Sequence, residues 1–367
     1  MIIEEILELA VSKKASDIHI SANLPPVLRI DGKLFRTNLP VLTPDDVETV
    51  LFPILSNDQR RELEQNWELD FGYGLANIGR FRVNIYRDKG AYAAAFRTIN
   101  STPPTFSELG LPEIIKKVAE RPRGLILVTG PTGSGKSTTL AAMIDYINST
   151  RVEHILTIED PIEFIHKSKK SVVHQRELGQ DTKSVANALR SALREDPDVI
   201  LVGEMRDLET TRLALTAAET GHLVLGTLHT SSASQTIDRI VDIFPEIQQQ
   251  QVRLQLSLSL VAVFSQCLLP RLQPNGVKQG RVMAQEIMLV NSAIANLIRE
   301  QKTAQIYSQI QMGTGMGMQT LDKCLENLVK QKLCDPLDAI VKSAKPDQLK
   351  QTLGVAITPP GAGVGME

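Results

Sequence analysis

The sequence predicts an α/β protein, in which a doubly wound parallel sheet follows a smaller mixed domain of the α+β type. Three observations carry this prediction. The chain has 367 residues, which favours two or three domains. Short strand-like runs and turn signals fill the first hundred residues or so, whereas apolar strand-length runs alternate with helical stretches from Gly124 onward. Alternation of that kind is typical of a parallel sheet with helices on both faces.

Residues 1–100 are predicted to form the smaller domain. The stretch from Ile2 to Val11 has helical periodicity, with one apolar face. Short runs typical of strands follow, and turn signals such as Asp31-Gly32 separate them. The predicted strands cover residues 17–20, 27–30, 81–86 and 92–99. Two prolines in the segment 100–105 resist helix and sheet, so residues 101–122 are interpreted as a linker and the approach to the next domain.

Residues 123–290 are predicted to form the parallel-sheet core. Pro197 is expected to end one of its helices, and Gly221 is placed to take a left-handed conformation after another. The expected strands cover 125–128, 154–158, 199–202 and 223–228, and the expected helices cover 136–147, 183–194 and 209–220.

The C-terminal part, from about Gln255, is interpreted as mainly helical. Within it, a helical region is predicted over 291–352, and Asn291 can cap a helix that runs through Glu300. Residues 353–367 are rich in glycine and proline, which predicts a disordered tail.

Composition argues against several classes of protein. The net charge is −2 and only 4% of residues are aromatic, so neither a basic field nor stacking platforms for nucleic acid are expected. Three cysteines without a CxxC pair predict reduced thiols and no zinc module. The acidic N-terminus is unlike a signal peptide, and the longest apolar run, 256–264, is far shorter than the ~20 residues of a spanning helix. A cytoplasmic protein that reaches membranes through a partner is therefore expected.

The segment 130–137 reads GPTGSGKS and satisfies every fixed position of the phosphate-binding pattern G-x-x-x-x-G-K-[ST]. It follows a predicted strand and precedes a predicted helix, as that pattern requires. Glycines let backbone N–H groups surround phosphate oxygens, and the helix N-terminus adds positive potential. Lys136 is expected on the β- and γ-phosphates of ATP and Ser137 on the bound Mg²⁺. The predicted nucleotide-binding residues are Gly130, Pro131, Thr132, Gly133, Ser134, Gly135, Lys136, Ser137 and Thr138.

Acidic residues follow two of the predicted core strands, those at 154–158 and 199–202. Ligands of parallel sheets bind at the carboxyl ends of the strands, so these acids are expected beside the phosphate loop. There a water that attacks the γ-phosphorus needs an acceptor, and Mg²⁺ needs oxygen ligands. Glu204 is assigned to Mg²⁺ and its water shell, and Glu163 is the candidate catalytic base. Glu159 remains the alternative base.

Two histidines and two arginines complete the candidate site. His222 and His229 bracket the predicted strand 223–228, and both are candidates for γ-phosphate sensors or for switches at a subunit interface. Arg82 and Arg97 lie on predicted strands of the first domain. Because a phosphoryl-transfer transition state gains from an arginine supplied across an interface, both are candidates for that role. The competing interpretation for each arginine is a solvated side chain.

Several signature stretches together identify a family. They are Ala15-Ser-Asp-Ile-His19, Pro25-Pro-Val-Leu-Arg-Ile-Asp-Gly32, the phosphate loop, Ile158-Glu-Asp-Pro-Ile-Glu163, Ala188-Leu-Arg-Ser-Ala-Leu-Arg-Glu-Asp-Pro197, Val202-Gly-Glu-Met-Arg-Asp207, and Thr220-Gly-His222 with Leu228-His-Thr230. Over about residues 1 to 345 the chain resembles the type IV pilus retraction ATPases of the type II/IV secretion ATPase superfamily.

The resemblance implies a PAS-like N-terminal domain, a RecA-like P-loop ATPase core and a homohexameric ring that binds ATP between domains and subunits. It further implies that the ring is peripheral at the inner membrane, where it acts on a membrane-embedded platform protein and drives pilin back into the membrane.

Within the superfamily, two features favour a retraction ATPase over an extension or secretion ATPase. The chain lacks the tetracysteine module and longer N-terminal region of the latter, and 293–300 resembles the retraction motif AIRNLIRE, with Ala295 in place of its first arginine. The competing interpretation of 293–300 is a packing helix with Ile294, Leu297 and Ile298 inward. An accessory or regulatory nucleotide-binding ring subunit is the remaining alternative.

Overall fold

A computed structural model describes residues 2–30, 32–75, 78–99 and 102–355 of the chain. The chain divides into two compact units. The first unit contains residues up to 103 together with the segments 159–167 and 175–184, and the second contains 104–158, 168–174 and the chain from 185 onward. Among the described residues, no helix combines the length and the apolar character needed to cross a membrane.

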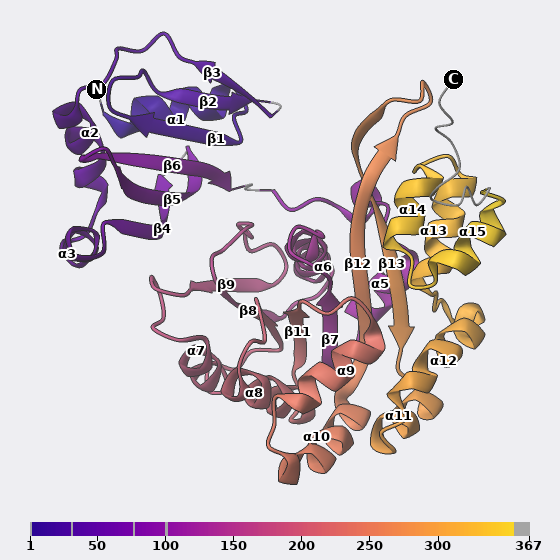
Figure 1. Cartoon of the computed structure of the whole chain (residues 1–367). Helices are drawn as coiled ribbons and strands as arrows, with labels where there is room; N and C mark the ends of the chain where they lie inside the picture. Colours follow the sequence, from indigo (N-terminus) through magenta and orange to yellow (C-terminus); the bar gives the residue numbers. More distant parts are fainter. Residues whose placement is uncertain (1, 31, 76–77, 100–101, 356–367) are drawn as a thin grey trace, which may run out of the picture. The chain divides into compact units, whose positions relative to one another are not determined.

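The first unit is built on an antiparallel six-stranded sheet with the order β3-β2-β1-β6-β5-β4 (Figure 1). The predicted helix at 2–11 and all four predicted strands are confirmed, whereas β3, β4, α2 and α3 were missed. In chain order the elements are α1 (Ile3–Ser12), β1 (Asp17–Ser21), β2 (Val27–Ile30), β3 (Lys33–Arg36), α2 (Pro44–Leu51), α3 (Asn57–Asn66), β4 (Glu68–Leu75), β5 (Gly79–Asp88) and β6 (Ala91–Ile99).

One face of this sheet carries the hydrophobic core of the first unit. Along β5, the side chains of Phe81, Val83 and Ile85 are fully buried, while Arg82 between them is exposed. The apolar face of α1 joins the same core. Because side chains alternate across a strand, Arg82 of β5 and Arg97 of β6 are presented on the opposite face.

The second unit contains a seven-stranded sheet with the order β13-β12-β7-β11-β10-β8-β9. The strands β12, β7, β11, β10 and β8 run parallel to one another, and β13 is antiparallel to β12. This confirms the predicted parallel sheet. The strands are β7 (Gly124–Thr129), β8 (His154–Glu159), β9 (Val172–Glu177), β10 (Val199–Val202), β11 (Leu223–Leu228), β12 (Leu260–Leu272) and β13 (Lys278–Leu289).

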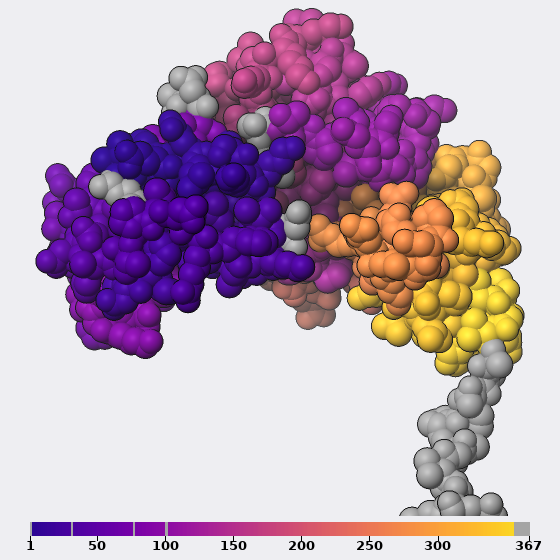
Figure 2. Space-filling view, turned by 90° about the horizontal axis from the view of Figure 1, so that it is seen from above, coloured from indigo at the N-terminus to yellow at the C-terminus, as the bar shows by residue number. Residues whose placement is uncertain are grey.

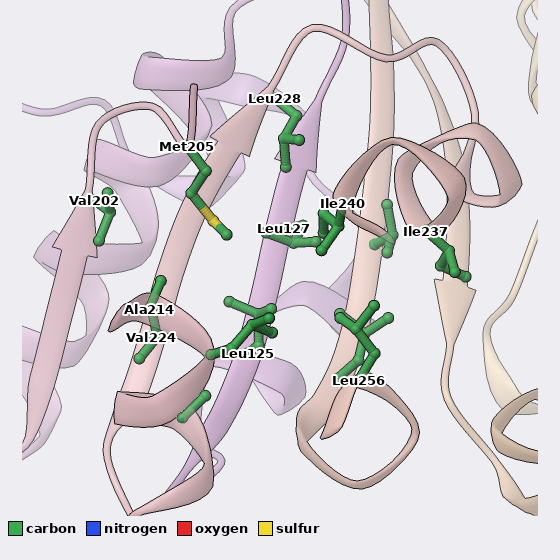
Figure 3. Close-up of a cluster of buried hydrophobic side chains, with 14 of the residues drawn as sticks. Leu125, Leu127, Val202, Met205, Ala214, Val224, Leu228, Ile237, Ile240 and Leu256 are labelled. Carbon is green, nitrogen blue, oxygen red and sulfur yellow. The ribbon is translucent and has the colours of Figure 1, made fainter. Parts of the chain in front are cut away.

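Helices cover both faces of this sheet, and the strands divide their side chains between two cores. Leu125 and Leu127 of β7 enter one core, which also holds residues of α7–α12 (Figure 3). Ile126 and Val128 enter the other, beneath α4–α6. The helices are α4 (Phe106–Leu109), α5 (Glu113–Ala119), α6 (Lys136–Thr150), α7 (Val185–Ala192), α8 (Leu208–Glu219), α9 (Ala233–Asp242), α10 (Glu246–Ser259), α11 (Ser292–Arg299) and α12 (Ile306–Met312).

Helix ends agree with the sequence in part. Gly221 follows α8 with φ of +120°, as predicted. The helix predicted over 183–194 is shorter, since α7 ends at Ala192, well before Pro197. Residues 100–101 of the predicted linker lie outside the described residues, and Thr105 at its end caps α4 by accepting a hydrogen bond from the backbone N–H of Glu108.

The expectation of mainly helical structure from Gln255 was wrong for residues 260–289. There the chain forms β12 and β13, a long antiparallel hairpin. The first ten residues of β12 are nearly all buried, because it is an interior strand of the sheet and packs on both faces. A buried strand lacks the alternation of apolar and polar residues that marks a half-exposed one, and a short apolar run does not separate strand from helix.

The region 291–352 is helical as predicted. Asn291 accepts a hydrogen bond from the backbone N–H of Ile294 and so caps α11, in which Ile294 and Ile298 are fully buried. Three further helices, α13 (Leu321–Lys330), α14 (Pro336–Lys342) and α15 (Pro346–Leu353), pack beside the hairpin (Figure 2). Of the predicted tail, residues 356–367 lie outside the described residues, and Leu353 still belongs to α15.

Candidate active site

The phosphate loop joins β7 to α6. All six residues of β7 are buried, and the loop that follows turns sharply through Gly133 and Gly135, whose φ angles are +78° and +87°. These values belong to the left-handed region, which glycine enters without a steric penalty. Helix α6 begins at Lys136, so the backbone N–H groups of its first turn face the loop. The strand, loop and helix that the motif requires are all present.

Gly130 is held where no side chain fits. A Cβ built on it would lie 2.2 Å from the carbonyl oxygen of Gln266 and 2.6 Å from the Ser134 Oγ. We expect Gly130→Ala to reduce the free energy of unfolding by about 3 kcal/mol or more, because it adds overpacking against backbone to an unfavourable φ. Gly133→Ala, which meets nothing within 4 Å, should cost only about 1–2 kcal/mol of φ strain. Urea unfolding of both variants measures the difference, and equal losses would contradict this explanation.

Lys136 and His229 lie together at this loop. The Lys136 ammonium donates to the carbonyl oxygens of Gly130, at 2.9 Å, and Pro131, at 3.3 Å. Its Nζ is also 3.5 Å from the Nδ1 of His229. His229 follows β11, whose last residue Leu228 pairs with Thr129 at the end of β7. The parallel register therefore brings the histidine to the carboxyl ends of the strands, where the phosphate loop leaves β7.

Glu204 lies next to this pair. Its Oε1 is 3.0 Å from the Nε2 of His229, and its Oε2 accepts from Arg206 at 2.8 Å. Burial by itself would raise the pKa of the Glu204 carboxyl, but the hydrogen bonds from Arg206 and His229 outweigh burial and hold the pKa below its ordinary value. The carboxylate is thus kept ionised, in a line of polar groups that runs from Lys136 through His229 to Arg206.

This pKa makes stability depend on pH. Because the folded state lowers the pKa of Glu204 below its ordinary value of 4.5, the unfolded chain binds a proton more readily as pH falls. The stabilisation from Glu204 is present above pH 4.5 and is lost as pH falls through the folded-state pKa. We therefore expect the stability difference between the wild type and Glu204→Gln to be largest near neutral pH and to shrink in acid. Urea unfolding from pH 7 to pH 3.5 tests this, and a difference that stays constant would contradict it.

The structure does not bring His222 to the phosphate loop. His222 precedes β11, and the next residue, Leu223, pairs with Gly124 at the start of β7. The loop leaves the other end of β7, so the length of the sheet separates His222 from it. The Nδ1 of His222 lies 2.9 Å from the carbonyl oxygen of Ala217, an ordinary contact to the end of α8. Two histidines that bracket one strand necessarily lie at opposite ends of that strand.

The other acidic cluster follows β8. Ile158 pairs with Val202, so β8 and β10 end level with each other, as the prediction assumed. Glu159 and Glu163 belong to the first unit. The Oε1 of Glu159 accepts a hydrogen bond from Gln175 at 3.2 Å. The Glu163 side chain is exposed to solvent.

Sequence reasoning missed a buried acid in the first unit. Glu177 is 2% exposed, forms an ion pair with Arg80 at 2.7 Å and accepts from the backbone N–H of Ile162 at 3.2 Å. Glu177 therefore connects the loop after β8, through Ile162, to Arg80 of β5. A carboxylate in a segment without a recognised motif gave no signal, and its partner Arg80 directly precedes the strand predicted at 81–86.

Arg82 and Arg97 are directly opposite each other on β5 and β6. Arg97 donates to Asp17 at 3.0 Å, and Arg82 lies 3.8 Å from Asp70. The side chain of Arg97 is 72% exposed and that of Arg82 is 49% exposed. Both guanidinium groups thus remain available to a further anion on the open face of the sheet, beyond the acid that each one already contacts.

The residues at the loop suit a magnesium ion that arrives with a triphosphate. Ser137, at the second position of α6, offers a hydroxyl, and Glu204 offers a carboxylate, both of the oxygen type that Mg²⁺ prefers. Since both Glu204 oxygens already accept hydrogen bonds, its role fits the water shell of the ion better than direct ligation. Across the described residues, no group of three or more His, Cys, Asp or Glu side chains could hold a metal.

The chain is similar to several known proteins. A family model described as "Type II/IV secretion system protein" matches residues 105–335. The type IV pilus retraction ATPase PilT of Pseudomonas aeruginosa is 54% identical over 95% of this chain and 99% of its own length. A twitching motility protein of Neisseria gonorrhoeae is 57% identical over 85% of this chain and 82% of its own. A crystal structure described as the pilus retraction motor PilT with bound ADP has a TM-score of 0.88 and 52% identity, and the match covers 96% of this chain and 99% of that one.

The matched family range contains the phosphate loop, Glu204 and His229, and the similarity to the PilT proteins extends through the N-terminal sheet as well. The predicted RecA-like core with a smaller N-terminal α+β domain is confirmed by the structural match. The chain therefore belongs to the type II/IV secretion system protein family and, within it, to the pilus retraction ATPases.

Proposed function

We propose that this chain is the subunit of a homohexameric motor that couples ATP hydrolysis to the retraction of type IV pili, and thereby to twitching motility. The observation that carries the proposal is 54% identity to a PilT retraction ATPase over 95% of the chain. It is joined by the phosphate loop, where Lys136, His229 and Glu204 form one polar cluster. Such a cluster has the groups that phosphoryl transfer needs.

In this proposal ATP binds to residues 130–138 with Mg²⁺. Lys136 contacts the β- and γ-phosphates by exchanging its present carbonyl acceptors for phosphate oxygens. Ser137 and water molecules held by Glu204 would bind the ion, which would neutralise charge that develops on the phosphates. Glu163 orients and deprotonates the attacking water, with Glu159 as the alternative. The support for Glu163 is its exposed carboxylate in the loop that follows a core strand.

We infer that His229 responds to the γ-phosphate, and the support is its contact with both the loop lysine and Glu204. A change in the position of Lys136 on nucleotide binding therefore reaches Glu204 through one imidazole. His222, at the end of β11 away from the phosphate loop, is retained only as a candidate for a subunit-interface switch.

Two arginines support an assembly in which one subunit contributes to the nucleotide site of the next. Arg82 and Arg97 offer two exposed guanidinium groups side by side, and we infer that they reach a nucleotide held by a neighbouring subunit. Residues 1–100 would then be a domain that completes the site of another copy, while residues 123–290 hold ATP and 291–352 form the helical region. We further infer that the ring acts at the cytoplasmic face of the inner membrane on the platform protein of the pilus machine.

Two measurements on the purified protein and one in cells test the proposal. Phosphate release from ATP should depend on Mg²⁺, and light scattering should give six times the chain mass of 40.4 kDa. Expression in a piliated bacterium that lacks its own retraction ATPase should restore twitching. ATP binding without phosphate release would instead favour the accessory or regulatory ring subunit. Restored pilus extension without twitching would favour an extension ATPase.

Ala295 bears on the last measurement. The side chain of Ala295 is 9% exposed and lies on the buried side of α11, beside the fully buried Ile294. The helix thus packs through this part of the retraction-like motif, and its exposed residues remain free for a partner. Restoration of twitching by the wild-type chain would show that retraction does not need an arginine at this position.

A further inference from the structure

We infer that Gln266 is a positioning residue for the nucleotide phosphates: its buried amide fixes the orientation of the phosphate loop. This inference rests on the proposed function, since it concerns the same nucleotide. Gln266 lies on β12, is 3% exposed, and its Nε2 donates to the carbonyl oxygen of Ser134 at 2.9 Å. No sequence motif singled it out.

The hydrogen bond acts on the peptide group that matters for phosphate. In a trans peptide the C=O of one residue and the N–H of the next point in opposite directions. By holding the carbonyl of Ser134 toward β12, Gln266 directs the N–H of Gly135 the other way, toward the inside of the loop. Inward N–H groups are what a loop of this kind uses to bind phosphate oxygens.

The orientation of the Gln266 amide is itself fixed. Its Oε1 accepts from the Thr139 hydroxyl at 3.0 Å and from the Nε2 of Gln285 at 3.2 Å. With two donors at the oxygen, the amide nitrogen must face Ser134. Thr139 is in α6 and Gln285 in β13, and both side chains are buried. One amide therefore links the loop, the helix that follows it and the hairpin.

The backbone of β12 supports the same arrangement. The carbonyl oxygen of Gln266 lies only 2.2 Å from the position that a Cβ on Gly130 would take. The first residue of the loop and the Ser134 peptide are thus both fitted against Gln266. The loop glycines alone leave many backbone conformations open, and this contact selects the one with the Ser134 carbonyl turned outward.

Three variants test the inference. Gln266→Met keeps the size and removes both hydrogen-bonding groups, whereas Gln266→Glu keeps the acceptor but sets a carboxylate against the Ser134 carbonyl. Gln311→Met, on the exposed surface of α12, is the matched control. The dissociation constants of ADP and of inorganic pyrophosphate, which contains only the phosphate part, are measured for each by calorimetry.

We expect Gln266→Met to weaken ADP and pyrophosphate binding alike, by roughly tenfold, the equivalent of one buried hydrogen bond. Gln266→Glu should be weaker still at pH 8. As pH falls toward 5.5, a protonated carboxyl regains a donor for Ser134, so the affinity of Gln266→Glu relative to wild type should recover, while that of Gln266→Met should not. Gln311→Met should bind as the wild type does.

A purely structural role makes a different prediction. In that case Gln266→Met would lower the melting temperature of the free protein but leave the stabilisation by a given ADP concentration unchanged. That result, or wild-type affinity in both Gln266 variants, would overturn the inference. The assay needs only binding, so a wild-type protein that binds ADP without hydrolysing ATP would contradict the proposed motor and still test Gln266.

Discussion

Lys136→Ala is expected to abolish ATP hydrolysis and to weaken ATP binding by about a hundredfold or more. The variant removes the one cation that the phosphate loop supplies, and each charge-assisted hydrogen bond contributes about 1.5–3 kcal/mol. The ammonium lies 2.9 Å from the carbonyl of Gly130 and 3.5 Å from His229. Its loss therefore removes both the contact to phosphate and the link from the loop to Glu204.

Phosphate release at saturating ATP and titration with a fluorescent ATP analogue measure the two effects separately. Lys117→Ala is the matched control, because Lys117 is an exposed lysine on α5 in the same unit, and it should retain wild-type turnover. Circular dichroism and thermal melting confirm that both variants fold. Hydrolysis by folded Lys136→Ala at more than a few per cent of the wild-type rate would contradict the assigned role of the loop.

The alternation of strands and helices in the second unit could be predicted because the spacing of apolar residues differs clearly between its strands and its helices. The strands β7, β8, β10 and β11 are mainly apolar runs of four to six residues, whereas α7 and α8 have apolar residues spaced three or four apart. The phosphate loop was predictable for a further reason, since a fixed pattern of glycines and one lysine has few alternative uses. Glu204 then followed from the rule that ligands lie at the carboxyl ends of parallel strands, whereas His229 was selected only because it brackets a predicted strand together with His222.

Other elements left weaker signals or were overlooked. Helices α2 and α3 have capping boxes, in which Thr43 pairs with Asp46 and Ser56 with Gln59, and these could have been found from the sequence. In β4, Gly72 and Gly74 weaken the pattern of a strand. The hairpin of β12 and β13 was hidden because an interior strand is apolar on both faces.

Positions that depend on tertiary contacts were beyond the sequence. The use of Gln266 arises from a hydrogen bond across 132 positions of the chain to Ser134. The register of β11 with β7 separates His222 from His229, which sequence reasoning had treated as a pair. In each case the residue type is compatible with many roles, and only the neighbours that folding supplies select one.

Glu163→Gln is expected to lower the turnover number for ATP by about 10²–10⁴-fold, the range for loss of a general base, while ATP binding stays within about twofold of the wild type. The amide keeps the size of the side chain but cannot accept a proton from the attacking water. Because the Glu163 side chain is exposed, the substitution should change stability by no more than about 0.5 kcal/mol. Rapid mixing of ATP with the variant should therefore give a bound but unreacted complex.

Glu159→Gln distinguishes the alternative base. The carboxylate of Glu159 accepts a hydrogen bond from Gln175 at 3.2 Å and is half-buried. Its replacement by glutamine keeps an acceptor but removes the charge that strengthens this hydrogen bond, so it should lower the melting temperature, an effect not expected at Glu163. If Glu163 is the base, turnover collapses in Glu163→Gln without any loss of stability, and Glu159→Gln loses stability with a smaller loss of turnover. The reverse pattern, with wild-type turnover in Glu163→Gln, would transfer the role to Glu159. Since the two carboxylates differ in their hydrogen bonds and exposure, stability and turnover measured on the same samples separate a water-activating acid from one that holds the loop in place.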